Sequence, residues 1–150
     1  MSVGNFNAAA IRFSNIERVL HSMKSEQMAK YGLRHTHLVC MVYIDQSEDG
    51  LTPTEISKIC DFDKAFVSRI TSELIQKNII KINDKFNDGR KYRNKYVLTE
   101  KGREVIRETK ALIEKYFADL SDKISEHDMS CFIRVILAIN ESAAVKENDI

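Results

Sequence analysis

The chain has 150 residues, of which 43% are hydrophobic and 30% are charged, and its formal net charge is +1. A chain of this length can bury a core, and 5 glycines with 1 proline favour a mainly helical domain over disorder or a many-turned β fold. No apolar run is long enough for a membrane span, and Asn5, Asn7 and Arg12 interrupt the N-terminal apolar positions, which fits neither a signal peptide nor a transmembrane helix. We therefore expect a cytoplasmic protein with no membrane partner.

The first two predicted elements are helices. Apolar residues of the N-terminal segment recur at intervals of three, four and seven, which predicts one face of a long helix that ends near Gly32. These residues are Phe6, Phe13, Ile16, Leu20 and Met23. Residues 36–46 are densely apolar and long enough for a buried helix, with a buried strand as the less favoured alternative.

A short helix is predicted to begin at Pro53. Thr52 can cap the free backbone amides, Pro53 suits the first helical position, where no N–H donor is needed, and Glu55 can complete a capping box. Ile56 and Ile59 are expected to face inward. The helix would be the first of a helix-turn-helix.

The next helix is the candidate recognition helix. Asp63 can cap it. Its buried side is expected to consist of Val67, Ile70, Leu74 and Ile75. Its opposite face begins with five residues that could meet DNA, namely Lys64, Ala65, Phe66, Ser68 and Arg69. A helix N-terminus favours phosphate, although this pattern taken alone is better explained as a solvated helix face.

A hairpin with a basic tip follows. Two short strands are predicted around residues 79–82 and 96–98, with the turn at Asp88 and Gly89, because glycine tolerates the backbone angles of tight hairpins. The basic residues at and beyond the tip are Arg90, Lys91, Arg93 and Lys95. Residues 64–103 contain eleven Lys or Arg against four Asp or Glu, a net charge of +7, whereas the rest of the chain carries −6. This concentration of one sign favours a nucleic-acid partner over charge that serves only solubility.

The C-terminal third predicts two helices with more apolar surface than a monomer would leave uncovered. The first is expected to begin near Glu100 and to end with Phe117, Leu120 and Ile124. The second is apolar on most of its circumference through Phe132, Ile133, Val135, Ile136 and Ile139. Soluble monomers rarely expose such patches, so these helices predict a homodimer, with an intrachain core as the alternative.

Several motifs follow one another in the middle of the chain: Leu51-Thr52-Pro53-Thr54-Glu55-Ile56, Val67, Leu74, Asp88-Gly89-Arg90 and Leu98-Thr99-Glu100-Lys101-Gly102. In this order and spacing the chain resembles the MarR family of bacterial winged-helix transcription regulators, over nearly its whole length. The resemblance implies a mainly α fold with a small β wing in a single unit, with a winged helix-turn-helix at 35–103 and dimerisation helices at 1–34 and 104–150. It also implies a homodimeric repressor that binds a palindromic operator on double-stranded DNA and is released by a small ligand or by oxidation.

The recognition helix is expected to enter the major groove. Arg69 is the best candidate for a guanine edge, and Ala65 or Phe66 for a thymine methyl, with Lys64 and Ser68 beside them. Thr54 is expected to hold phosphate. Phe66 stands where the family commonly has a small polar residue, so the base preference stays open.

The wing residues take their roles from the family resemblance. It implies that Arg90 enters the minor groove, that Asp88 orients it or braces the loop, and that Lys85 and Lys91 contact phosphates. Asn78 replaces the glycine that is usual after the recognition helix, which is tolerable because Asn accepts the left-handed conformation better than most residues.

A metal site is not expected. His35, His37 and Cys40 lie close together in the sequence, but on a helix the two imidazoles point about 200° apart and cannot easily serve one ion. The zinc-sensing branch of the family uses a histidine pair on the long helix after the wing, and this chain has no histidine between Glu100 and Glu126. We therefore predict no metal and no cofactor.

Regulation by oxidation or by a ligand is open. Cys40 lies in the most apolar helix, where cysteine is usually inert, and Cys60 is expected to be more exposed but without a resolving thiol. With Cys131 the cysteines are odd in number and widely spaced, which does not indicate a disulfide framework. By family likeness a small aromatic ligand would occupy a pocket lined by Tyr31, His37 and Tyr43, although aromatics on an apolar helix are more often core.

Three other functions are less favoured by the sequence. An enzyme is not expected, because the sequence contains no glycine-rich phosphate loop, nucleophile elbow or plausible metal triad. A winged-helix protein-interaction module is the alternative, but such a module would be expected to lack the wing arginine and the basic strip. A redox-responsive regulator that uses Cys60 or Cys40 is the other open alternative.

Overall fold

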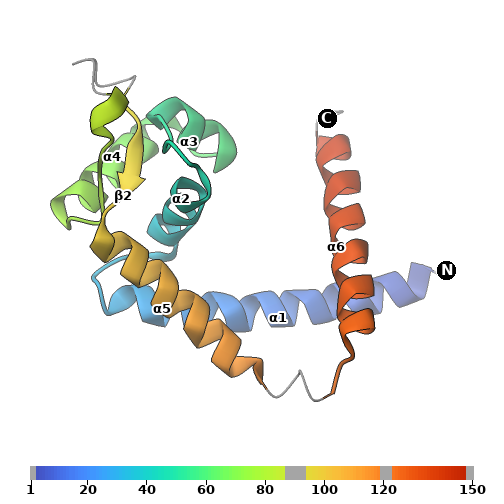
Figure 1. Ribbon diagram of the computed structural model, residues 1–150. Coiled ribbons are helices and arrows are strands. Elements are labelled where there is room, and N and C mark those ends of the chain that lie inside the picture. Colours follow the sequence, from blue (N-terminus) through green and yellow to red (C-terminus); the bar gives the residue numbers. More distant parts are fainter. Residues whose placement is uncertain (1–2, 87–93, 119–122, 148–150) are drawn as a thin grey trace. The chain divides into compact units, whose positions relative to one another are not determined.

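The computed structural model describes residues 3–86, 94–118 and 123–147, and the side chains of residues 7–85, 94–118 and 123–141 (Figure 1). Within these ranges the fold is mainly α-helical with one two-stranded sheet, as predicted. The elements in chain order are α1 (Val3–Ala29), α2 (His35–Gln46), α3 (Pro53–Ile59), α4 (Lys64–Gln76), β1 (Ile80–Ile82), the 3-10 turn η1 (Asp84–Phe86), β2 (Tyr96–Leu98), α5 (Glu100–Tyr116) and α6 (Glu126–Glu147). None of the helices in the described ranges is long and apolar enough to cross a membrane.

α1 ends close to the predicted residue, and the turn after it depends on Gly32. The Leu33 N–H donates to the Met28 carbonyl at 2.9 Å. Gly32 has a φ of +63°, a conformation that residues with a Cβ rarely adopt. The apolar segment that follows forms the helix α2 and not a strand, which confirms the favoured prediction.

Side-chain caps start α3 and α4 at the predicted residues. The Glu55 N–H donates to the Thr52 hydroxyl at 3.3 Å, and the Thr52 N–H donates to the Glu55 carboxylate at 2.7 Å. The Asp63 carboxylate accepts a hydrogen bond of 2.8 Å from the Phe66 N–H at the start of α4. A short turn containing Asp61, whose φ is +53°, separates the two helices. This is the helix-turn-helix that the caps predict.

Two isoleucines expected in the core are instead exposed, so that part of the prediction was wrong. Ile59 is 45% exposed and Ile75 is 43% exposed. α3 has only seven residues and buries only Ile56 among its side chains, so its last residue reaches beyond the core. On α4 the neighbouring Leu74 takes the core position, and successive helical residues are separated by about 100° around the axis.

The strands form an antiparallel pair that is tied to the start of α3. Ile80 pairs with Leu98 and Ile82 pairs with Tyr96. Leu51 adds a single bridge on the other side of Tyr96, with backbone hydrogen bonds of 3.1 and 2.8 Å. Gly50 makes this approach possible, because a Cβ there would lie 2.2 Å from the Tyr96 carbonyl oxygen. The base of the hairpin is therefore fixed relative to the helix-turn-helix.

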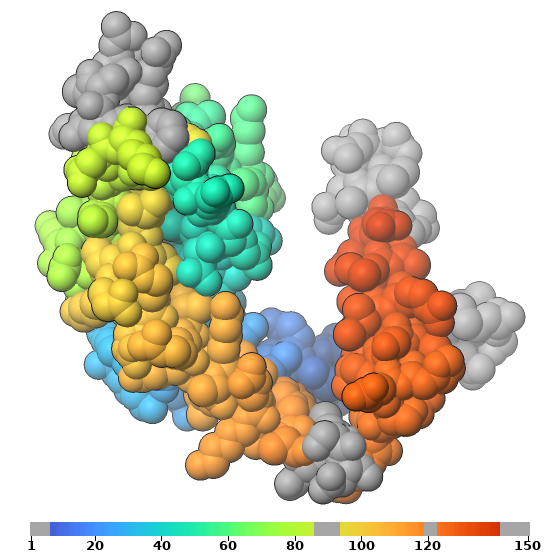
Figure 2. All heavy atoms as spheres, in the orientation of Figure 1, coloured from blue at the N-terminus to red at the C-terminus, as the bar shows by residue number. Residues whose placement is uncertain are grey.

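One hydrophobic core joins these elements. Its fully buried side chains come from the end of α1, from α2, α3, α4, β1 and α5, and from Ile79 before β1. The largest apolar ones are Met28, Met41, Ile44, Ile56, Ile70, Leu74, Ile79 and Ile80. α5 packs against the end of α1 (Figure 2), where the Gln27 amide donates to Glu108 at 2.9 Å and the Tyr31 hydroxyl donates to the same carboxylate. These contacts hold α5 beside the end of α1.

The chain divides into two compact units, Met1–Ile113 and Glu114–Ile150. The predicted end of the long helix was too late. α5 ends at Tyr116, Phe117 and Ile124 lie outside the helices, and Leu120 lies outside the described residues.

In the second unit, α6 begins after Ser125, whose hydroxyl accepts a hydrogen bond of 3.1 Å from the Asp128 N–H. Among its described residues, the large exposed apolar side chains are Met129, Phe132, Ile133, Val135 and Leu137.

Candidate nucleic-acid interface

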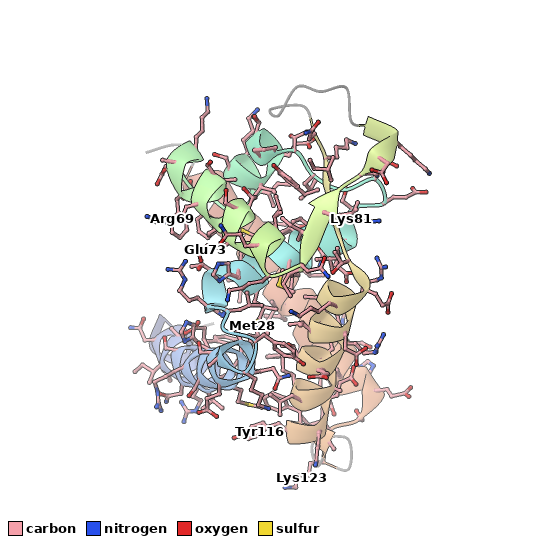
Figure 3. All side chains as sticks on the ribbon, turned by 90° about the vertical axis from the view of Figure 1, so that its left-hand side faces the viewer. Met28, Arg69, Glu73, Lys81, Tyr116 and Lys123 are labelled. Atoms are coloured by element: carbon pink, nitrogen blue, oxygen red, sulfur yellow. The ribbon has the colours of Figure 1, made fainter. Side chains whose placement is uncertain are left out.

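The buried side of α4 determines which residues the helix exposes. Val67, Ile70 and Leu74 are at most 1% exposed, and they lie one helical turn apart on one face. The exposed residues of the first two turns are Lys64, Ala65, Ser68 and Arg69, and Phe66 is half-buried at their edge. Four of the five residues predicted to meet DNA therefore share the solvent-facing surface of α4. Figure 3 shows Arg69 one turn nearer the N-terminus of α4 than Glu73.

α3 contributes Thr54, which is exposed in the first turn of the helix. Its neighbours Thr52 and Glu55 are occupied by the capping box, whereas the Thr54 side chain lies outside that network. The Thr52 N–H, which donates to the Glu55 carboxylate, lowers the pKa of this carboxyl from its ordinary value of 4.5, aided by the Thr52 hydroxyl and the positive charge of Lys95. The start of α3 is thus rigid, with an exposed hydroxyl on its first turn.

Aromatic contacts link the turn before α4 to the guanidinium of Arg69. The rings of Phe62 and Phe66 pack edge to face, with centroids 5.0 Å apart and an interplanar angle of 89°. The Arg69 guanidinium carbon lies over the Phe66 ring at 5.0 Å from its centroid. Both phenylalanines also pack against the hydrophobic core. Phe66 is therefore in contact with the core on one side and with Arg69 on the other.

The wing is described only at its base. Lys81 on β1 and Lys85 on η1 are exposed. The Asn83 N–H donates to the Lys95 carbonyl at 2.8 Å, and the Asn83 amide donates to the Asp49 carbonyl at 3.0 Å, which joins both sides of the hairpin to the loop before α3. The predicted tip residues Asp88, Arg90 and Lys91 lie outside the described residues.

A polar cluster that the sequence did not indicate connects α2 to α4. The Glu73 carboxylate accepts a 2.7 Å hydrogen bond from the Arg34 guanidinium and lies 2.9 Å from Nε2 of His37. Nδ1 of His37 accepts the Arg34 N–H at 2.9 Å, so the Nε2 proton is the one donated to Glu73. The His37 side chain is 1% exposed. Its two nitrogens are thus used to hold α4 against the start of α2.

Charge and burial in this cluster act in opposite directions on its two titrating groups. Burial lowers the pKa of His37, although Glu73 counteracts part of that effect. The pKa of Glu73 is raised by desolvation but lowered more by Arg34 and His37, so that it falls below its usual range. The favoured state is therefore a neutral imidazole beside a charged carboxylate, with Arg34 supplying the positive charge.

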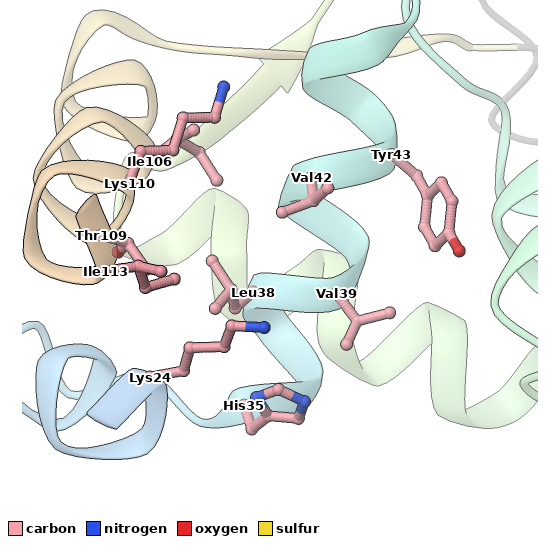
Figure 4. A pocket seen from close by; sticks show the side chains of 10 residues that line it. All are labelled: Lys24, His35, Leu38, Val39, Val42, Tyr43, Ile106, Thr109, Lys110 and Ile113. Atoms are coloured by element: carbon pink, nitrogen blue, oxygen red, sulfur yellow. The ribbon is translucent and has the colours of Figure 1, made fainter. Parts of the chain in front are cut away.

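A cavity of about 340 Å³ lies between α1, α2 and α5 (Figure 4). Its lining residues are Lys24, His35, Leu38, Val39, Val42, Tyr43, Ile106, Thr109, Lys110 and Ile113. Most of the wall is apolar, with Lys24 and His35 at one end and Lys110 on α5. Nδ1 of His35 is buried and has no partner among the described atoms. The cavity therefore combines apolar walls with Lys24, an imidazole nitrogen without a partner, and Lys110, whose Nζ lies 3.5 Å from the Asp45 carboxylate.

Of the three residues predicted to line a ligand pocket, the cavity includes only Tyr43. His37 is turned to Glu73, and the Tyr31 hydroxyl donates to Glu108. The cationic residues Lys24 and Lys110 were missed, because they belong to helices whose approach to α2 no local sequence pattern reveals.

Cys60, which the sequence pairs with no other thiol, lies beside Cys40 in the structure. Both thiols are free, and Cys40 is fully buried on α2. Burial raises the pKa of Cys40 to about 12, and it also raises the pKa of Cys60, so both thiols are held in their unreactive form. Among the described residues, no group of three or more His, Cys, Asp or Glu could hold a metal ion.

Comparisons with known proteins agree on the fold. No protein-family model and no curated protein sequence matches the chain. A solved MarR family transcription regulator matches with a TM-score of 0.78 and 16% identity, over 98% of this chain and 95% of that one. Staphylococcus aureus MarR in complex with salicylate and kanamycin matches with a TM-score of 0.73 and 21% identity, over 96% and 98%.

A third match has nucleic acid bound. A mutant of Staphylococcus aureus MepR bound to an oligodeoxyribonucleotide matches with a TM-score of 0.63 and 16% identity, over 90% of this chain and 97% of that one. Identities this low establish the fold alone. The chain has the fold of the MarR-type winged-helix regulators, as its motifs predict.

Proposed function

We propose that this chain is a sequence-specific DNA-binding transcription regulator of the MarR type, acting in the cytoplasm and not as an enzyme. The observation that carries the proposal is the exposed start of α4, where Lys64, Ser68 and Arg69 face solvent on a segment with a net charge of +7. An exposed, capped and cationic second helix of a helix-turn-helix is suited to the major groove. The fold shared with a DNA-bound MepR supports the same partner.

The proposal gives each element of the interface a role. Arg69 reads a guanine edge and Ala65 lies against a thymine methyl, while Lys64 and Ser68 add contacts in the groove. Thr54 at the start of α3 and Lys85 at the base of the wing hold phosphates. At the wing tip, by likeness to the family, Arg90 enters the minor groove, Asp88 orients it and Lys91 contacts phosphate.

We further propose that the protein is a homodimer on a palindromic operator. Exposed apolar side chains support this: Ile133 and Val135 on α6 are 50% and 56% exposed, and Ile11 and Ile16 on α1 are 65% and 45% exposed. A two-fold protein matches a two-fold operator, since one helix-turn-helix reads only a half-site.

Repression relieved by a small aromatic carboxylate is the mode of regulation that the cavity favours. Leu38, Val42 and Ile106 offer apolar surface, and Lys24 offers a positive charge for a carboxylate. The salicylate complex of the similar MarR supports this ligand class. Salicylate should therefore weaken DNA binding by wild type, and Lys24→Ala should reduce that response. An equal response in the variant would remove the cavity from the proposal.

The DNA-binding proposal is tested by selecting duplexes from a random library with the wild-type protein and measuring affinity by fluorescence anisotropy. Arg69→Ala should lose about 1–3 kcal/mol on the selected duplex, because its base contact is lost. Arg107→Ala on α5, where Arg107 pairs with Glu104, is the matched control and should bind like wild type. If wild type enriches no sequence and binds no DNA at low salt, the proposal fails, and a protein-interaction module replaces it.

A further inference from the structure

The base-reading arginine of the proposed interface has an aromatic ring beneath it. The guanidinium carbon of Arg69 lies over the Phe66 ring, 5.0 Å from its centroid. The two residues are three positions apart on α4, which places them on neighbouring turns of one face. The electron-rich face of an aromatic ring attracts a guanidinium, and a planar guanidinium can also stack on it.

Neighbouring groups restrict the position of the Phe66 ring. Phe62, in the turn before α4, packs its ring edge to face with that of Phe66 at 5.0 Å. Both rings also pack against the hydrophobic core, which limits their rotation. The Asp63 carboxylate accepts the Phe66 N–H at 2.8 Å and so holds the backbone at the same position. A platform anchored in this way can restrict the side chain that lies on it.

The acidic residue that could compete for Arg69 is engaged elsewhere. Glu73 lies four positions further along α4, a spacing at which an arginine and a glutamate commonly pair. Its carboxylate is instead bound by Arg34 at 2.7 Å and by His37 at 2.9 Å. Within the described part of the chain Arg69 has no ion pair, so its guanidinium donors are available to a ligand.

We propose that Phe66 is a positioning residue that holds the Arg69 guanidinium ready for its base, and that Phe66 does not itself contact a base. The inference rests on the proposed DNA-binding function and deepens it. A guanidinium already restricted in the free protein loses less conformational freedom on binding, so the contact gains affinity and selectivity. The thymine-methyl contact then belongs to Ala65 alone.

A double-mutant cycle tests this on two duplexes, the one selected by wild type and a scrambled one of equal length. Phe66→Leu keeps apolar volume but removes the ring, and should weaken binding to the selected duplex about two- to fivefold. It should leave binding to the scrambled duplex unchanged. In an Arg69→Ala background it should have no further effect, whereas in a Lys64→Ala background its effect should persist. Phe66→Tyr, which keeps the ring, should bind like wild type.

An equal loss for Phe66→Leu in the wild-type and Arg69→Ala backgrounds would overturn the proposal, because it would mean that Phe66 acts independently of Arg69. Thermal unfolding establishes that Phe66→Leu is folded. If it is not, the side-chain protons of Arg69 in free wild type provide the test by NMR: the proposal predicts an upfield ring-current shift, and its absence contradicts it. Failure of wild type to select any duplex would overturn the DNA-binding function, while this shift would still report on the stack.

Discussion

His37 shows how a single buried side chain can connect α4 to the rest of the fold. It is 1% exposed, and it bridges the Arg34 backbone on one side and the Glu73 carboxylate on the other. In its neutral form the imidazole satisfies both partners. A second proton on Nδ1 would replace the acceptor for the Arg34 N–H with a donor, so protonation opposes the native arrangement.

Stability should therefore depend on pH through His37. Burial lowers its pKa from the ordinary 6.5, with Glu73 opposing and Arg34 and Lys77 assisting that shift. Below pH 6.5 the unfolded chain takes up a proton that the folded protein resists, so the unfolding free energy falls as pH drops, by at most about 1.4 kcal/mol per pH unit.

Urea unfolding at several pH values between 5 and 7.5 measures this effect. His37→Gln, which can still accept the Arg34 N–H, should show a weaker fall toward acid than wild type. His127→Gln removes an exposed imidazole from α6 and is the control for the loss of a histidine side chain. An unchanged pH dependence in His37→Gln would show that the imidazole is not held neutral.

At the scale of elements, two threonines at the beginning of α3 have different roles: Thr52 stabilises the helix, and Thr54 is available to a ligand. The Thr52 hydroxyl caps the helix by accepting from Glu55 at 3.3 Å. Thr54, two residues later, is exposed and lies outside the capping box. The same chemical change at these positions should therefore have different consequences.

Thr52→Ala should lower the unfolding free energy by about 1 kcal/mol, because it removes an N-cap. Thr54→Ala should change stability by less than about 0.5 kcal/mol but weaken binding to all duplexes alike, because it removes the proposed phosphate contact. Chemical denaturation and anisotropy on the same protein samples measure both quantities. Equal losses of stability in the two variants would contradict the assignment of these roles.

Helices whose ends are set by residues close together in the sequence could be predicted from the sequence. The starts of α3 and α4 follow from Thr52 and Asp63, because a cap and its partner lie within three residues. The contact between His37 and Glu73 could not be predicted, because 36 residues separate the two side chains and only the packing of α2 against α4 brings them together. The same holds for the cavity, whose lysines come from α1 and α5. Hydrophobic periodicity also wrongly predicted that Ile59 and Ile75 are buried, because the pattern does not show at which residue a helix extends beyond the core.

At the scale of the whole molecule, α6 is the element whose surface most needs an explanation. Phe132, Ile133, Val135 and Leu137 are each at least 45% exposed. A second copy of the chain would cover such a surface, as the homodimer proposal requires.

Ile133→Glu should shift the protein from dimer to monomer at micromolar concentration, because the interface would have to bury an unpaired charge. Size-exclusion chromatography with light scattering measures the mass directly. Ser72→Glu on α4 adds the same charge outside the predicted dimerisation helices and should stay dimeric. A monomeric wild type, or a dimeric Ile133→Glu, would remove α6 from the interface.

The central claim is that the +7 segment and the exposed start of α4 bind and read DNA. The most direct measurement is the affinity of wild type for its selected duplex and for a scrambled duplex, at salt concentrations from about 50 to 200 mM. We predict that both affinities fall steeply with salt and that the selected duplex binds tighter by at least about a thousandfold. Equal affinity for the two duplexes, or no binding at the lowest salt concentration, would contradict the claim.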